Sequence, residues 1–99
     1  MAVNRRRGEV AAILDGRERR LCLTLGALAE IEAAFGCTRM SELDARMRNL
    51  SAADLTVVLA ALLRGGGEGE AAAALGSADV SPGAAAKAVA EAFRLGLAG

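Results

Sequence analysis

Several residue types on which catalysis and metal binding commonly depend are missing from this 99-residue chain. There is no histidine, tryptophan or tyrosine. Cys22 and Cys37 are the two cysteines, and neither lies in a CxxC motif. Without histidine or a cysteine cluster we expect no zinc site and no histidine base, and no nucleophile stands out in a strained turn. We therefore expect a non-enzymatic protein with no catalytic, cofactor-binding or metal-ligating residues.

Aromatic residues are almost absent as well, since Phe35 and Phe93 are the only two. Hydrophobic residues nevertheless make up 54% of the chain. Alanine, leucine and valine must therefore fill most of the interior, and each of them buries little area. A chain of this length forms one small domain, so we expect a thin core.

Long apolar runs are also missing. No run approaches the roughly 18–20 residues that a membrane-spanning helix needs. Residues 1–7 have a basic start, but Gly8, Glu9 and the charges at 15–20 interrupt any signal-peptide core. We expect a soluble, cytoplasmic protein with no membrane contact.

The charge is balanced overall but uneven along the chain. Twelve basic and twelve acidic residues give a formal net charge of zero. The six basic residues of the first 24 positions are all arginine, which suits a phosphate or an acidic protein surface. However, no aromatics interleave with them, and the pI is about 6.2. These arginines are thus better interpreted as the solvated surface of a hairpin than as the DNA-binding surface of a small regulator. We do not expect a nucleic-acid partner.

The N-terminal quarter has the pattern of a β-hairpin. After a basic arm at residues 1–8, which we expect to be disordered, alternation predicts strands at 9–14 and 17–24. Asp15-Gly16 between them favours a type I′ turn, because both central residues need positive φ. This turn places Leu14 opposite Arg17, and one face then collects five apolar residues, namely Val10, Ala12, Leu14, Leu21 and Leu23. Each strand is expected to leave one edge unpaired and open to strand addition.

Helical periodicity takes over after the hairpin. Thr24 is expected to cap a helix at 25–35 that ends at Gly36. Ser41 resembles the start of a capping box for a short helix to about residue 48. Ser51 repeats that signature and begins a stronger helix that reaches about Arg64.

The last third of the chain is rich in glycine and alanine. We interpret Gly65-Gly66-Gly67 as a flexible stop and residues 65–80 as a flexible linker containing a short helical piece. Asp79 or Ser81 then caps a final helix at 81–97, with Pro82 in its first turn. The fold class is α+β, with an N-terminal β-hairpin followed by three to four short α-helices. Residues 9–99 form a single domain, in which 9–24 is the hairpin and 25–64 the helical core.

Three segments resemble a known family. These are GEVAAILDGRERRLCLTLGALAEIEAAFG (8–36), SAADLTVVLAALLRGGG (51–67) and AAAKAVAEAFRLGL (84–97). Together they resemble the small tail proteins of gene transfer agents and related prophages of α-proteobacteria, which are assigned as phage tail assembly chaperones. The most specific parts are LTLGALAEIEAAFG and LLRGGG, and neither is a catalytic motif.

The resemblance implies a tail assembly chaperone that binds the tape-measure protein or other tail proteins and helps the tail tube to assemble. The alternative is a structural tail component, a tube or connector subunit that stays in the particle. A homo-oligomer is also an open alternative. Two apolar helix stripes are the candidate partner-binding residues: Leu55, Val58, Leu59, Leu62, Val89, Phe93 and Leu97.

Overall fold

The computed structural model describes residues 3–98, and its elements follow in the order of a hairpin and then helices. A 3-10 helix η1 (Arg5–Arg7) precedes strands β1 (Glu9–Leu14) and β2 (Arg17–Cys22). Then come α1 (Leu25–Phe35), α2 (Met40–Met47), α3 (Ala52–Gly65), α4 (Gly69–Ala73), the 3-10 helix η2 (Leu75–Ser77) and α5 (Pro82–Leu97). The predicted α+β class, a hairpin followed by helices, is confirmed.

The hairpin forms as its turn chemistry predicts. Asp15 and Gly16 both have positive φ, at 52° and 75°, as a type I′ turn requires. Leu14 pairs with Arg17 and Val10 with Leu21, which is the predicted register. The predicted apolar face is buried. The return strand ends at Cys22 rather than at residue 24, because Thr24 is taken as a helix cap.

Side-chain caps fix the starts of three helices. Thr24 accepts a hydrogen bond from the N–H of Ala27, and Ser51 forms a full capping box with Asp54. Ser81 caps α5, with Pro82 at the first helical position. These three predicted starts are confirmed.

The predicted start of the short helix α2 at Ser41 is wrong. The helix begins at Met40, and Arg39 stands at its cap without a side-chain hydrogen bond. The hydroxyl of Thr38 bonds to Glu42 instead. Ser41 therefore lies two residues beyond the cap position, inside the helix, and cannot act as its N-cap.

The expected disordered arm is also different in the structure. Residues 5–7 form η1, whose N-cap Asn4 accepts from Arg6, and Gly8 closes the turn with φ at 80°. The side chain of Glu9 in turn accepts from the N–H of Asn4 at 2.8 Å. Residues 1 and 2 of that predicted arm lie outside the described residues.

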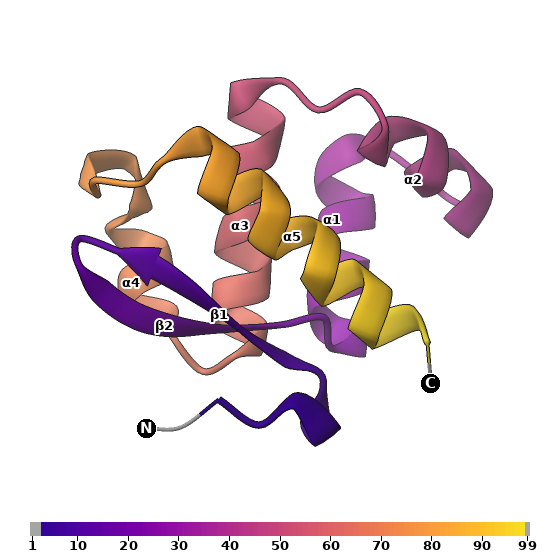
Figure 1. The fold of residues 1–99 in the computed structure, drawn as a ribbon. Helices are drawn as coiled ribbons and strands as arrows, with labels where there is room; N and C mark the ends of the chain where they lie inside the picture. Colours follow the sequence, from indigo (N-terminus) through magenta and orange to yellow (C-terminus); the bar gives the residue numbers. More distant parts are fainter. Residues whose placement is uncertain (1–2, 99) are drawn as a thin grey trace.

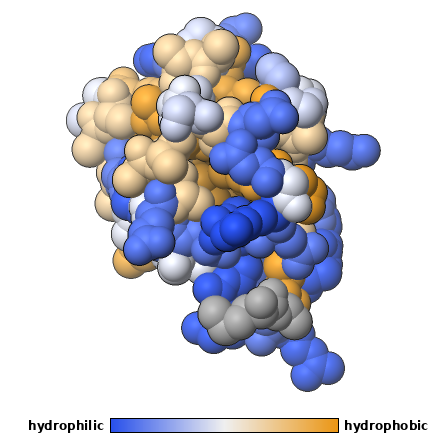
Figure 2. Space-filling model, turned by 90° about the vertical axis from the view of Figure 1, so that its left-hand side faces the viewer, coloured by the Kyte–Doolittle hydropathy of each residue, from blue (hydrophilic) through white to orange (hydrophobic). Residues whose placement is uncertain are grey.

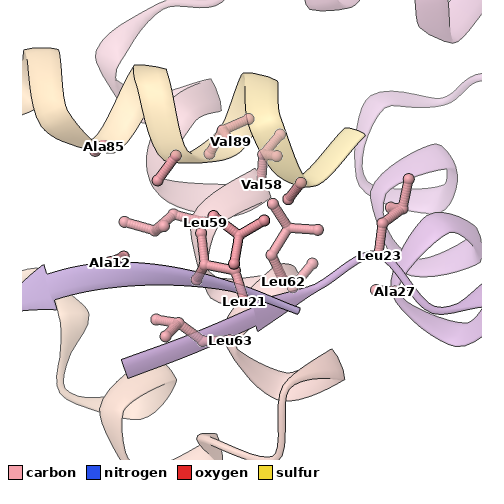
Figure 3. Packing of buried hydrophobic residues seen from close by; sticks show 14 of the residues in the cluster. Ala12, Leu21, Leu23, Ala27, Val58, Leu59, Leu62, Leu63, Ala85 and Val89 are labelled. Carbon is pink, nitrogen blue, oxygen red and sulfur yellow. The ribbon is translucent and has the colours of Figure 1, made fainter. Parts of the chain in front are cut away.

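Helix α3 lies at the centre of the fold, where it contacts α1, α4, α5 and β2. In Figure 1, α5 crosses over α3 and over the hairpin, while α1 and α2 lie on the far side from the hairpin turn. The core between them is aliphatic (Figure 3): Leu21 of β2 meets Leu59 and Leu62 of α3, and Val89 of α5 closes it from above. Large aromatic side chains are not needed because alanines on α5 let the helix approach closely.

The glycines after α3 have a packing role that the sequence did not reveal. A Cβ atom at Gly65 would lie 2.2 Å from the carbonyl oxygen of Cys22, and one at Gly66 would lie 2.2 Å from that of Arg20. Residues 65–67 do end the helix as predicted. They also press the end of α3 against the outer edge of β2, so the prediction that both strand edges are open is wrong for β2 from Arg20 to Cys22.

Candidate functional site

An apolar groove lies between α2 and α5. It has a volume of about 560 Å³. Residues of α2 form one wall and residues of α5 the other, while Leu55 of α3 and Leu50 just before that helix also line it. The lining residues are Met40, Leu43, Asp44, Met47, Leu50, Leu55, Ala86, Val89, Ala90, Phe93, Arg94 and Leu97.

Helical periodicity produces both walls. On α5 the lining residues recur every three or four positions from Ala86 to Leu97, so they form one stripe. On α2 the same spacing brings Met40, Leu43 and Met47 to one side. The two stripes face each other across the groove without filling it, since Met40 and Leu97 remain 45% and 55% exposed.

The α2 wall is held in place by a few specific contacts. The guanidinium of Arg46 lies over the ring of Phe35 in α1, 4.6 Å from its centroid. It also bonds to Asp54 in the first turn of α3 at 3.3 Å. Helix α2 packs chiefly on α1.

The rim of the groove carries an ion pair on each of its two sides. Asp44 on α2 pairs with Arg48 at 2.8 Å, and both side chains are mostly exposed. Arg94 on α5 pairs with Glu91 at 2.5 Å. Hydrogen bonds from Arg94 and from Arg5 lower the pKa of Glu91 to about 2. Asp44 and Arg94 are the members of these two ion pairs that line the groove.

The sequence-predicted candidates fall into two groups. Leu55, Val89, Phe93 and Leu97 line the groove. By contrast, Val58, Leu59 and Leu62 are buried in the core, where they hold α3 in the fold.

Sequence reasoning missed the α2 wall. Met40, Leu43 and Met47 recur at spacings of three and four, which is the signal for a helical apolar stripe. The misplaced helix start at Ser41 put Met40 outside the helix and hid this stripe. Leu50 was missed for a different reason, because it lies between helices and no periodicity marks it.

Several arginines of the basic N-terminal region are engaged within the protein. Arg5 bonds to Glu91 at 2.7 Å, and Arg19 bonds to Glu68 at 3.4 Å. The backbone N–H of Arg20 donates to Glu68 at 3.0 Å and keeps the pKa of that carboxyl below its usual range. Figure 2, which views the molecule from the hairpin-turn side, shows hydrophilic side chains over its middle and lower parts. These ion pairs tie η1 and β2 to α5 and α4.

Chemistry-bearing clusters are scarce on this molecule. Across residues 3–98 there is no group of three or more cysteine and carboxylate side chains that could hold a metal ion. Cys22 and Cys37 are both free thiols, and burial raises the pKa of Cys22, which makes its thiolate less accessible. No helix in this part of the chain is long and apolar enough to cross a membrane.

Comparison with known proteins assigns the chain to a family. No curated protein and no solved structure matches it. The model of the family described as "Phage tail tube protein, GTA-gp10" matches residues 7–99, which is nearly the whole chain from η1 onward. The resemblance to gene-transfer-agent tail proteins is thereby confirmed at the level of a phage tail family. The chain belongs to the phage tail tube protein family GTA-gp10.

Proposed function

We propose that this protein is a structural component of a phage-like tail, a subunit of the tube or its connector that stays in the finished particle. The family match over residues 7–99 is the observation that carries this proposal, because the family is described as a tail tube protein. Its role is non-enzymatic: it binds other tail proteins, and it is made in the cytoplasm before assembly. The chaperone interpretation becomes the second candidate.

The groove between α2 and α5 is the proposed contact surface for another tail protein. Its lining is apolar along both walls, and Met40 and Met47 are flexible side chains that adapt to the shape of an occupant. The occupant that fits is an amphipathic helix, which would place its apolar stripe between the walls. The ion pairs of Asp44 and of Arg94 make the rim polar on both sides, which suits the polar face of such a helix.

The same groove favours the second candidate function, a tail assembly chaperone. An adaptable apolar groove of this kind suits transient binding of apolar helical segments, such as those expected in a tape-measure protein. The two functions use the same surface but differ in the fate of the protein. A structural subunit remains in the particle, whereas a chaperone leaves before assembly is complete.

Quantitative mass spectrometry of purified particles separates the two functions. A structural subunit is expected in a fixed ratio to the other tail proteins, while a chaperone is expected in the producing cell and not in the particles. Absence from intact, washed particles would overturn the structural role and leave the chaperone.

A pair of matched variants tests the groove itself. Leu97→Asp places a charge in the groove, and Leu25→Asp places the same charge at an 84% exposed position outside the groove lining. Neither leucine is buried, so both variants should fold. We expect Leu97→Asp to abolish co-purification with other tail proteins expressed from the same tail operon and Leu25→Asp to leave it unchanged. Equal binding by both variants would contradict a role for the groove.

A further inference from the structure

Strand β1 has an outer edge whose backbone groups are free to pair with another strand. In a hairpin with a two-residue turn, Leu14 and Arg17 form a hydrogen-bonded pair, and such pairs alternate along the strands. The backbone groups of Ala11 and Ile13 therefore point away from β2. Within residues 3–98, no hydrogen bond engages these outward N–H and C=O groups.

This open edge is short and has defined ends. At one end the N–H of Glu9 donates to the carbonyl of Asn4 at 3.1 Å. At the other end the N–H of Asp15 donates to the carbonyl of Asp79 at 3.1 Å. Ala11 and Ile13 thus offer two donors and two acceptors to a partner strand.

The two edges of the hairpin differ in their protection. On β2, the carbonyl of Arg20 lies against Gly66 and that of Cys22 lies against Gly65. The carboxylate of Glu68 accepts a hydrogen bond from the N–H of Arg20. Strand β2 is also mostly charged, since four of the six residues in its sequence RERRLC are charged. Folded monomers normally protect an edge strand with charges, proline or a bulge, and residues 10–14 of β1, VAAIL, contain none of these. An unprotected apolar edge indicates a strand that is paired when the protein works.

We propose that β1 pairs antiparallel with β1 of a second copy of this chain. In the register that uses every free group, Ala11 of one copy faces Ile13 of the other, and four backbone hydrogen bonds form about a two-fold axis. The outer side chains also match, because small Ala11 lies opposite Ile13, which is 56% exposed in the single chain. The result is a four-stranded sheet with the two β2 strands at its outer edges.

The chemistry of the two strands favours β1 over β2 as the strand that pairs with a second copy. A β1–β1 pair brings no charged side chain of residues 10–14 together, whereas β2 against β2 would bring arginines close to one another. The contact is small compared with the roughly 1,200 Å² of a stable interface, so dimerisation should be weak in dilute solution and strengthened within an assembly. The proposed structural role supplies only the assembly in which this pairing would occur. The pairing itself is tested on purified protein, so its failure would leave the proposed function untouched.

Sedimentation equilibrium up to millimolar concentration tests the pairing with matched variants. Ile13→Lys adds a charge to the open edge, and Leu25→Lys adds the same charge at an exposed site on α1. We expect the wild type and Leu25→Lys to dimerise and Ile13→Lys to dimerise at least about tenfold more weakly. Dimerisation of Ile13→Lys at wild-type strength, or a wild type that stays monomeric, would overturn the proposal.

Disulfide trapping tests the register independently. In a background with Cys22→Ala and Cys37→Ala, a chain with Ala11→Cys is mixed with a chain with Ile13→Cys. The opposed positions would lie about 5.5 Å apart between Cα atoms, which a disulfide can span. We expect the mixed dimer to be the main oxidised product, and an Ala11→Cys chain mixed with a Glu18→Cys chain to give none. A mixture of the Ala11→Cys and Ile13→Cys chains that gives no more mixed dimer than the Glu18→Cys control would reject the second copy as the occupant.

Discussion

The contact between the end of α3 and the edge of β2 can be tested with a single added methyl group. Gly65 lies in the last turn of α3, and its backbone conformation suits any residue, because its φ is not positive. The added Cβ of Gly65→Ala would lie 2.2 Å from the carbonyl oxygen of Cys22 and 3.3 Å from Ala27 Cβ. Since the nearest atom belongs to the backbone, no side chain can rotate to relieve the overlap. The strand or the helix must move.

The size of the effect follows from two opposing contributions. Forcing an extra carbon into a packed contact costs about 1–3 kcal/mol, and an overlap with backbone belongs at the upper end of that range. Replacing a helical glycine by alanine returns up to about 1 kcal/mol. The net loss for Gly65→Ala is therefore about 2 kcal/mol, which lowers the melting temperature by roughly 8–16 °C in a domain of this size.

Gly26→Ala is the matched control for this prediction. Gly26 is also helical, near the start of α1, and its added Cβ would meet only Thr24 Oγ1 at an ordinary 3.8 Å. This variant should gain about 0.5–1 kcal/mol. Thermal and urea unfolding followed by circular dichroism measure both variants. If Gly65→Ala is as stable as Gly26→Ala, α3 does not approach the edge of β2 as closely as described.

Two further predictions concern the core and the surface charges. Leu62→Ala, in the fully buried core, should lose about 2–5 kcal/mol of unfolding free energy, whereas Leu97→Ala at the exposed groove rim should change it by less than about 0.5 kcal/mol in the same melts. Glu91 has its folded pKa lowered from 4.5 to about 2, so its ion pairs stabilise the protein above pH 4.5 and this contribution is lost as the pH falls toward 2. Because Glu91 is on the surface, the difference in stability between wild type and Glu91→Gln should be small and should decrease with added salt. The difference should also disappear as the pH falls from 4.5 toward 2. An equal difference at pH 2 and pH 7 would contradict the ion-pair geometry.

Local signals in the sequence were sufficient for the hairpin and for most helix starts. Asp15-Gly16, Thr24, Ser51 and Pro82 act through atoms within a few residues of themselves, and the structure uses each as predicted. The start of α2 was mispredicted because Ser41 offers a cap pattern that the chain does not use. A capping pattern shows that a cap is possible, but the neighbouring turn decides which residue takes it.

Non-local features of the fold had no signal in the sequence. Gly65 and Gly66 follow a helix, so a flexible stop was the natural interpretation. Their second role depends on Arg20 and Cys22, more than forty positions earlier, and only the folded chain shows that these carbonyls lie against them. The groove is similar: each wall has a periodic stripe, but whether two stripes face each other depends on the packing of α2 and α5.

The close contact at Gly65 and Gly66 also explains why the two strand edges differ. By closing most of the edge of β2, it leaves β1 as the strand with two adjacent outward residues, Ala11 and Ile13, whose backbone groups are free within the described chain. A chaperone that holds one partner needs a single surface, which the groove supplies. A subunit retained in a polymer contacts neighbours through more than one surface. The groove is compatible with either function, whereas simultaneous use of the groove and the β1 edge favours the structural one.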